Sequence, residues 1–512
     1  MPTTHRRWWL QAVGVSALLA APIVAVTYPP LTDLPQQVAQ MHLLERTLAG
    51  DERFRVQWWH PNKLAYLPIA LGWLLGGGLW AAKVVATTIV VAWTVALHAL
   101  AAARGRSLTL AALAATLVWN HAMYWGFLTF QLGFPLFVAW VILLDDAVER
   151  PGRRRLLARI VVASGLYFAH VLWLGAAIGL AVVEGVLRRV DRTEWLERSA
   201  ALAGPLLGIA VWYPSLTDGG FVSQTVFGRS VLERLEPAAL VETLYGGLRG
   251  ALEPLAAAVL LLVVGGSVGR WWRRDRAVTP LGPACRFDGG LVAAAALLAS
   301  AAFFLPDVAQ ATICFASRWL PPAAALLLLA VPTLAWSDRR PIWFASAARV
   351  AALGAVALFA MTTTVTWRDG AREELAGFNT ALAGIPAGSR VLGLDFERTS
   401  PRLRGKPYLH LDAWSQVLHG SELSRSFAEA ASSLVVYRRL PVAHPWTPNL
   451  DWFPERLRRS DLVSFDYVLW QQAGGPPAQV EADPALEIVE PRDRWTLLRV
   501  VAPAVDDSER GQ

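Results

Sequence analysis

The sequence predicts a polytopic α-helical membrane protein of about eleven transmembrane helices with a C-terminal extracytoplasmic α/β domain. Three observations lead to this fold class. Of the 512 residues, 54% are hydrophobic and only 17% are charged. In a typical soluble chain about a quarter of the residues are charged. Apolar runs near the roughly 20-residue length that spans a bilayer recur as far as Trp367. Beyond Arg368 the composition turns polar, and strand-like runs alternate with helical ones.

Arginine placement predicts the topology. The basic clusters lie in short loops between apolar runs, and a cytoplasmic position for all of them requires an even number of crossings between neighbouring clusters. The N-terminus is then cytoplasmic and the C-terminus extracytoplasmic, in the plasma membrane, which is the inner membrane of a bacterium. The predicted spans are residues 8–28, 80–103, 107–125, 127–147, 156–169, 171–188, 199–215, 251–269, 290–306, 319–337 and 345–366.

Three apolar segments can each be interpreted in two ways. The run from Trp8 to Thr27 follows Arg6-Arg7 like a signal peptide, but its length and the many later spans favour an uncleaved first helix. The 156–188 stretch is divided near His170, because one long span would put Arg155 and Arg188 on opposite faces. The segment from Leu64 to Gly78 is interpreted as interfacial or re-entrant, because a crossing there would reverse the arginine parity.

The predicted organisation follows from these spans. Residues 1–367 form the transmembrane domain, with a first outer loop at 29–79 that carries a surface helix and a second at 217–250. Residues 368–512 form the α/β domain, with strands expected at 389–395, 467–470 and 495–501. Helices are expected there at 371–383 and 421–434.

Asp33 is the first candidate for chemistry. It follows the first apolar run in a proline-rich segment, 29–35, that breaks any helix. Residues 36–48 then show helical spacing, with Gln37 and Gln40 off the apolar stripe, which predicts a helix on the membrane surface. Asp33 can cap this helix through its carboxylate oxygens. It can also act as a general base toward an acceptor hydroxyl, or as a metal ligand.

Four other polar residues lie at the predicted outer face. His60 is interpreted either as an interfacial polar tip or as a substrate contact. His121 and His170 are costly in lipid and should face a cavity or a partner, so each serves either a helix–helix hydrogen bond or ligand binding. Arg318 stands at the outer end of a span, against the charge bias. Its side chain either reaches the lipid headgroups or grips a phosphate with its planar fork.

Several classes of function find no support in the sequence. The chain contains no P-loop, no GxGxxG after a strand, no GxSxG elbow and no HExxH motif. The net charge of +7 comes from arginines in short loops, which indicates membrane orientation rather than nucleic-acid binding. The two cysteines, Cys285 and Cys314, fall in loops placed on opposite sides of the membrane, so no disulfide is expected. No cysteine–histidine spacing predicts zinc.

The layout resembles the GT-C superfamily of integral-membrane glycosyltransferases, as an uncharacterised bacterial branch. The shared features are an inward N-terminus, a first span, and a long outer loop with an early acidic residue and a surface helix. A proline-containing segment, Tyr66 to Gly76, follows, then a second span ending in arginine and an outer C-terminal domain. The resemblance implies transfer of a sugar from a polyprenyl-phosphate donor, which enters from membrane lipid, to a glycan, lipid or protein acceptor outside the cytoplasm.

Two positions carry the residue roles that the resemblance implies. Asp33 matches the first-loop acid, the catalytic residue, and Arg318 matches more loosely a late-loop basic residue that meets the lipid phosphate. Many members carry a paired acid in that loop, whereas Asp33 has Thr32 and Leu34 as neighbours. Gln37, one turn on, is a weaker metal ligand than a carboxylate. No cofactor is therefore expected. The loop lacks the paired acidic motif that would support binding of a divalent metal.

Substrate contacts are assigned to Arg318, His60, His121, His170 and Gln37. The alternative function is a non-catalytic membrane protein, either a transporter or a scaffold for envelope assembly. Transporters often show repeated halves and charges at mid-membrane. The sequence shows no internal repeat, and its polar residues within spans lie mostly near the ends.

Overall fold

The chain folds into two compact units. The computed structural model describes residues 8–145, 152–217, 224–272, 286–310, 312–332, 342–439, 444–490 and 493–501. Unit 1 comprises Met1–Ala25, Trp59–Leu67 and Val85–Val365, and unit 2 comprises Val26–Trp58, Pro68–Val84 and Thr366–Gln512. The basic clusters at 6–7 and 339–340, most of the one at 270–276, and Cys285 lie outside the described residues, so the predictions that rest on them stay predictions.

Unit 1 is built from long apolar helices. Among the described residues six helices are long and apolar enough to cross a bilayer. The chain is therefore an integral, polytopic membrane protein, and the count of eleven spans stays a prediction. The six are α1 (Trp8–Ala25), α4 (Gly78–Ala103), α7 (Leu128–Asp145), α9 (Val171–Arg188), α13 (Leu252–Trp272) and α16 (Ile342–Glu373).

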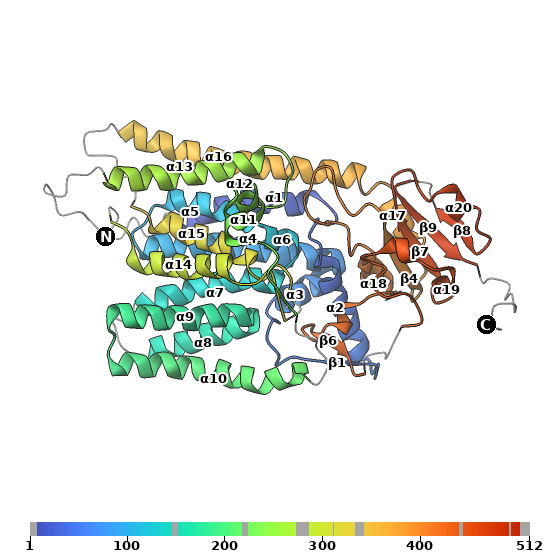
Figure 1. Ribbon diagram of the computed structural model, residues 1–512, viewed down its shortest axis with the longest axis horizontal. Helices are drawn as coiled ribbons and strands as arrows, with labels where there is room; N and C mark the ends of the chain where they lie inside the picture. Colours follow the sequence, from blue (N-terminus) through green and yellow to red (C-terminus); the bar gives the residue numbers. More distant parts are fainter. Residues whose placement is uncertain are drawn as a thin grey trace. The chain divides into compact units, whose positions relative to one another are not determined.

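Shorter helices fill the space between these spans. Helix α8 contacts α7, α9 and α10, and Figure 1 shows these four helices side by side. Two short strands, β2 (Thr225–Val226) and β3 (Val308–Ala309), pair antiparallel. The shorter helices are α5 (Leu108–Ala115), η1 (Thr116–Val118), α6 (His121–Tyr124), α8 (Arg153–Ala169), α11 (Val231–Leu235), α12 (Pro237–Leu244), α14 (Gly289–Phe304), η4 (Ser317–Trp319) and α15 (Leu320–Ala330). Helix α10 (Arg192–Thr217) is long, with 26 residues, and carries charged residues in its first turns.

A buried ion network joins α8 to α10. Arg159, which is fully buried, lies 2.6 Å from the Glu194 carboxylate, and Arg155 lies 2.6 Å from Glu197. Glu194 also accepts a hydrogen bond from Arg198 Nε at 2.8 Å. Removing one partner of such a buried network leaves an uncompensated charge, which is far more costly than losing an exposed ion pair.

We therefore expect Glu194→Gln to destabilise unit 1. The buried Arg159 would lose its nearest charged partner and keep only the Glu197 carboxylate, at 3.5 Å, at a cost of up to about 3 kcal/mol. Thermal unfolding of the detergent-solubilised protein would show a clearly lowered midpoint. The matched control is Glu487→Gln, which breaks the exposed pair with Arg499 and should leave the midpoint nearly unchanged. Equal midpoints for the two variants would contradict a stabilising role for the network.

Unit 2 combines the first loop with the C-terminal part of the chain. Helix α2 (Leu34–Leu48) contacts α18 (Ala413–His419). Strand β1 (Phe54–Val56) pairs antiparallel with β6 (Val435–Tyr437). Helix α3 (Tyr66–Gly76) has 11 residues, fewer than the roughly 17 that a span needs, and Gly77 with φ of +77° turns the chain into α4.

A five-stranded sheet forms the centre of the C-terminal part. The strand order is β5-β4-β7-β9-β8, with β4 parallel to β5 and β7, and β9 antiparallel to β7 and β8. Leu392, Leu394 and Trp470 lie in the core against one face. The elements are α17 (Phe378–Ala383), β4 (Arg390–Asp395), β5 (Glu422–Leu423), η5 (Phe427–Glu429), η6 (Pro454–Arg456), α19 (Arg459–Leu462), β7 (Tyr467–Gln471), α20 (Ala478–Glu481), β8 (Leu486–Glu490) and β9 (Trp495–Val500).

The predicted strands agree with β4, β7 and β9, but the predicted helices need correction. The helix expected at 421–434 is wrong, because Glu422 and Ser424 donate backbone hydrogen bonds to β4 and its flank. Only the short η5 forms there, capped by Ser426. In the stretch 371–383, α16 ends at Glu373 and α17 begins at Phe378, so a break replaces a continuous helix.

Candidate functional site

Asp33 immediately precedes α2 but does not cap it through its side chain. Its backbone has φ −88° and ψ −5°, and its carboxylate makes no capping hydrogen bond. A capping residue usually has an extended backbone, which points its side chain at the N–H groups of the first turn. The backbone carbonyl of Asp33 accepts from Gln37 N at 3.0 Å. The carboxylate is therefore available to a partner other than the N–H groups that it would cap.

That partner is His410, in the segment before α18. Its Nε2 lies 3.5 Å from Asp33 Oδ1, and the carboxylate side chain keeps 17% exposure. Burial, reinforced by the charge of Arg425, lowers the pKa of His410 to about 3. The imidazole is therefore neutral at pH 7, and Asp33 faces a polar ring rather than a positive charge.

Side chains at four-residue spacing hold the Asp33 segment in place. Thr32 Oγ1 donates to the Lys406 carbonyl at 3.1 Å, and Gln36 Nε2 donates to the Arg425 carbonyl at 3.0 Å. Gln40 Oε1 accepts from Val435 N at 2.8 Å. The sequence places Gln40 off the apolar stripe, as for a surface helix, but this side chain is buried against the C-terminal segment. Polar residues that recur every four positions lie on one face of a helix, so the spacing of Thr32, Gln36 and Gln40 is the signal for this buried polar face.

Gln37, the substrate-contact candidate on α2, is also buried, with 8% exposure. It lies in unit 2 with Asp33, one helical turn away. The structure thus brings these two sequence candidates together. The substrate-contact role of Gln37 stays a prediction.

The buried carboxylates of unit 2 include Asp395, Asp412 and Asp451, which no sequence pattern indicated. Asp395 ends β4, Asp412 precedes α18, and Asp451 follows in a later turn. Burial raises the pKa of Asp395 to about 7, and burial with the nearby Asp451 carboxylate raises that of Asp412 to about 7. In the part of the chain that the structure describes, no group of three or more acids, histidines or cysteines could hold a metal.

Arg318 belongs to unit 1 and is buried, with 3% exposure. Its Nε donates to the Cys314 carbonyl at 3.0 Å, and Nη2 donates to the Ile313 carbonyl. The guanidinium carbon lies 4.5 Å from the ring centre of Phe127 and 5.1 Å from that of Phe130. The side chain is thus packed inside unit 1, which disagrees with the alternative of reaching out to lipid headgroups.

Aromatic contacts connect Arg318 to His121. Trp125 Nε1 donates to His121 Nε2 at 2.9 Å, and the Trp125 ring stacks on Phe127 at 6.1 Å. Phe127 is one of the two rings beneath the Arg318 guanidinium. His121 accepts its hydrogen bond from within its own turn, so the structure places it beside the arginine rather than between two helices.

His170 lies on the other side of the same cluster. Its Nδ1 accepts from Leu172 N at 3.3 Å, so it caps α9, and its ring meets Phe130 edge-on at 5.5 Å. Arg318 and His170 thus contact Phe130, and His121 is connected to Phe127 through Trp125. We name this group, with Trp125, the Arg318 cluster.

The segment from His60 to Lys63 is docked onto the turn that carries His170. Asn62 Oδ1 accepts from Val171 N at 3.1 Å, and Lys63 N donates to the Phe168 carbonyl at 2.7 Å. Next to the sequence candidate His60 in this segment, Lys63 is buried, with 6% exposure. Burial lowers the pKa of Lys63 to about 7. A lysine in a loop gives no sequence signal of its burial.

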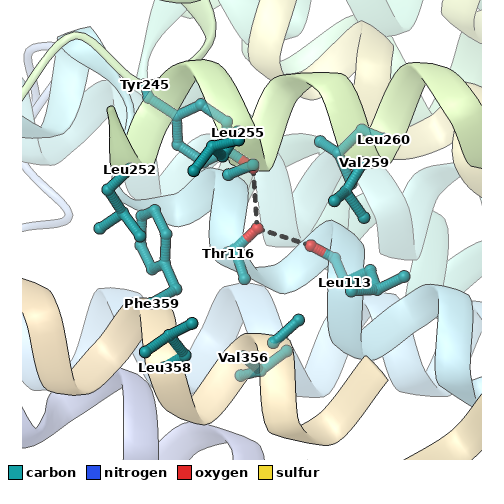
Figure 2. A pocket seen from close by; sticks show the side chains of 12 residues that line it. Leu113, Thr116, Tyr245, Leu252, Leu255, Val259, Leu260, Val356, Leu358 and Phe359 are labelled. Carbon is teal, nitrogen blue, oxygen red and sulfur yellow. Dashed lines mark hydrogen bonds between the residues drawn. The ribbon is translucent and has the colours of Figure 1, made fainter. Parts of the chain in front are cut away.

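An apolar cavity of about 130 Å³ lies in unit 1 between α5, α13 and α16. Figure 2 shows Tyr245 and Thr116 at one side of the cavity, with Leu252 and Phe359 beside them. Thr116 donates to the Leu113 carbonyl at 2.7 Å and lies 3.1 Å from the Tyr245 hydroxyl, so these polar groups satisfy one another. The cavity therefore offers hydrocarbon surface, and an apolar cavity of this size stays dry and takes up apolar molecules.

Two observations connect the cavity with its surroundings. Leu255 and Leu358 line it and are largely exposed on α13 and α16, two of the helices long enough to cross a bilayer. Tyr245, which lines the cavity, is followed by Gly246. A Cβ atom added at Gly246 would lie 3.0 Å from the Cβ atom of His121. The residue after Tyr245 thus packs against His121 of the Arg318 cluster.

Comparison with solved structures identifies the fold. Over 98% of the chain and 99% of the other, the protein resembles apo ArnT from Cupriavidus metallidurans, with a TM-score of 0.53 at 13% identity. ArnT from the same organism bound to undecaprenyl phosphate gives a TM-score of 0.51 at 14% identity, over 97% and 98% of the two chains. ArnT is a GT-C glycosyltransferase. The chain therefore has the GT-C fold.

A third structure is less similar. The mycobacterial arabinofuranosyltransferase AftD, also of the GT-C superfamily, matches 97% of this chain but only 41% of its own, with a TM-score of 0.45 at 17% identity. No protein-family model and no curated protein matches the sequence. The GT-C fold agrees with the resemblance inferred from the layout of spans and loops, and the roles of individual residues stay predictions.

Proposed function

We propose that the protein is a membrane glycosyltransferase that moves a sugar from a polyprenyl-phosphate donor to an extracytoplasmic acceptor. The observation that carries the proposal is the Asp33 carboxylate. Asp33 is the residue directly before α2. Its carboxylate makes no capping hydrogen bond to the helix and remains partly exposed. In a GT-C fold, a carboxylate so placed is suited to accept the proton of an acceptor hydroxyl.

The Arg318 cluster supports a lipid-phosphate donor. Arg318 is held by backbone carbonyls and two phenyl rings, so its charge is oriented before any ligand arrives. A preorganised guanidinium stabilises the negative charge that grows on a leaving phosphate. The apolar cavity offers hydrocarbon surface, and its lining residues Leu255 and Leu358 are exposed on two helices long enough to cross a bilayer, which suits part of a polyprenyl chain. The ArnT structure contains undecaprenyl phosphate, a ligand with these two parts.

The proposed reaction has one displacement. The acceptor hydroxyl oxygen forms a bond to the anomeric carbon of the sugar as the bond from that carbon to the phosphate oxygen breaks. Asp33 takes the hydroxyl proton, and polyprenyl phosphate leaves with the electron pair of the broken bond. Arg318 stabilises the departing phosphate. His60, His121, His170 and Gln37 are proposed to contact the substrates.

Lys63 is proposed as a second cation for the donor phosphate. Because its pKa is about 7, it loses its charge as the pH rises through neutrality. We expect the affinity for polyprenyl phosphate to fall above pH 7, approaching about tenfold per pH unit. Arginine stays charged over this pH range, so Lys63→Arg should remove the fall in affinity above pH 7. The same variant controls for ionisation of the phosphate, which affects both proteins alike. Binding measured from pH 6 to 9 in lipid nanodiscs provides the check. The same slope in both proteins would contradict the role.

Transfer itself is tested with purified protein in nanodiscs. A polyprenyl-phosphate sugar is supplied with lipid, glycan and peptide acceptors, and release of free polyprenyl phosphate is followed. Release that depends on an acceptor supports the proposal. Binding of polyprenyl phosphate without any transfer would favour the non-catalytic membrane protein, and absence of binding would contradict a polyprenyl-linked substrate altogether.

A further inference from the structure

The contact between Asp33 and His410 is closed by further contacts within unit 2. Gln36 Oε1, one turn beyond Asp33, accepts from Phe427 N at 3.1 Å. The Phe427 ring meets the His410 ring nearly edge-on, at 5.6 Å and 77°. The imidazole then lies 3.5 Å from Asp33. These contacts run from Asp33 through His410 and Phe427 to Gln36, one helical turn from Asp33.

Backbone contacts hold both partners on the outer sides of this group. Thr32, directly before Asp33, donates to the Lys406 carbonyl at 3.1 Å. On the other partner, the His410 carbonyl accepts from Ala413 N at 3.2 Å, which connects it to the start of α18. His410 is 5% exposed. These hydrogen bonds fix the chain on both sides of the pair, and burial limits the room in which the imidazole can turn.

The chemistry of a neutral imidazole suits this position. A protonated histidine would form an ion pair with Asp33 and weaken it as a base. Burial and the nearby Arg425 keep the pKa of His410 far below neutrality, so its Nε2–H can donate to the carboxylate without neutralising it. The distance of 3.5 Å exceeds that of an ordinary hydrogen bond, and such contacts often tighten only when substrate is bound.

We propose that His410 is a positioning residue for Asp33, donating from Nε2 to orient one carboxylate oxygen so that the other faces the acceptor hydroxyl. This inference rests on the proposed glycosyl transfer. It gives the C-terminal segment a part in the reaction, because His410 lies in that segment whereas Asp33 lies in the first outer loop.

The kinetic test compares three variants. His410→Phe keeps an aromatic ring against Phe427 but removes the N–H, and should lower kcat about 10- to 100-fold with KM for the donor unchanged. His410→Gln restores a donor at similar reach and should recover most of the rate. His419→Phe, at the end of α18, is the matched control and should behave as wild type. A full rate for His410→Phe, or an equal loss in His410→Gln, would overturn the inference.

A double-mutant cycle separates positioning from a general loss of structure. If His410 acts through Asp33, the Asp33→Asn/His410→Phe protein should be no slower than Asp33→Asn alone. Losses that multiply would show that His410 acts independently of Asp33, and would overturn the proposal.

A readout without activity distinguishes the failure of this inference from that of the proposed function. In protein labelled with ¹⁵N-histidine, the Nε2 signal assigned through His410→Gln should report an Nε2–H tautomer that shifts in Asp33→Asn. An unchanged signal contradicts the positioning contact even if sugar is transferred. A shifted signal in a protein that transfers no sugar keeps the contact and rejects the transferase function.

Discussion

Asp33→Asn is expected to lower kcat for sugar transfer by about 10²- to 10⁴-fold, the contribution of a general base. The amide has nearly the shape of the carboxylate but cannot take a proton from the acceptor hydroxyl. Because the carboxylate does not cap α2, the substitution should leave the fold and the affinity for polyprenyl phosphate unchanged. Initial rates at saturating donor, with donor binding measured separately in nanodiscs, would test both parts of this expectation.

The matched control for this variant is Asp51→Asn in the same loop. Asp51 pairs with Arg46 and Arg53 at the surface of unit 2, where ion pairs contribute about 1 kcal/mol or less. Its rate should equal that of the wild type. Transfer by Asp33→Asn at a comparable rate would remove Asp33 as the base, whereas loss of transfer in both variants would indicate disturbance of the loop.

Arg318→Met is expected to weaken binding of polyprenyl phosphate and to slow transfer. Charge-assisted hydrogen bonds contribute about 1.5–3 kcal/mol each, so affinity should fall at least about tenfold. The rate should fall by a further 10²- to 10³-fold or so, because the phosphate gains charge as it leaves. Arg318→Lys should recover only part of both, since lysine keeps the charge but lacks the planar fork.

Equilibrium binding and single-turnover rates separate the two effects of Arg318. The control is Arg249→Met, an exposed arginine of the second outer loop, which should bind and react as wild type. Equal affinity in Arg318→Met and wild type would contradict a phosphate contact. Because Arg318 packs on Phe127 and Phe130, a thermal unfolding curve for each variant must accompany these measurements.

Composition and periodicity were sufficient for the membrane class and for several elements. The long apolar runs predict α1, α4 and α7 because a bilayer demands uninterrupted helical hydrogen bonding over a set length. The break at His170 followed from arginine parity, and α8 indeed ends at Ala169 before α9 begins at Val171. The strands β4, β7 and β9 carry enough apolar residues to be recognised locally.

The site was only partly accessible to such reasoning. Asp33 could be singled out from its place after the first span, and Arg318 from its position against the charge bias. His410 and Lys63 could not, since neither stands in a pattern and each gains significance from burial. The helix expected at 421–434 failed for the same reason, because its backbone hydrogen bonds go to β4 and to distant side chains.

The sequence by itself determined what depends on solvent: a chain so apolar must place its helices in lipid, and its polar C-terminal part must fold outside it. Only the tertiary structure decided what depends on distant partners. It showed that Asp33 is not a side-chain cap, that His410 faces it, and that Arg318 is held by aromatic rings instead of extending to headgroups. The physical reason is range, because helix periodicity and hydropathy are local properties, whereas the geometry of a site is set by contacts between residues far apart in the chain.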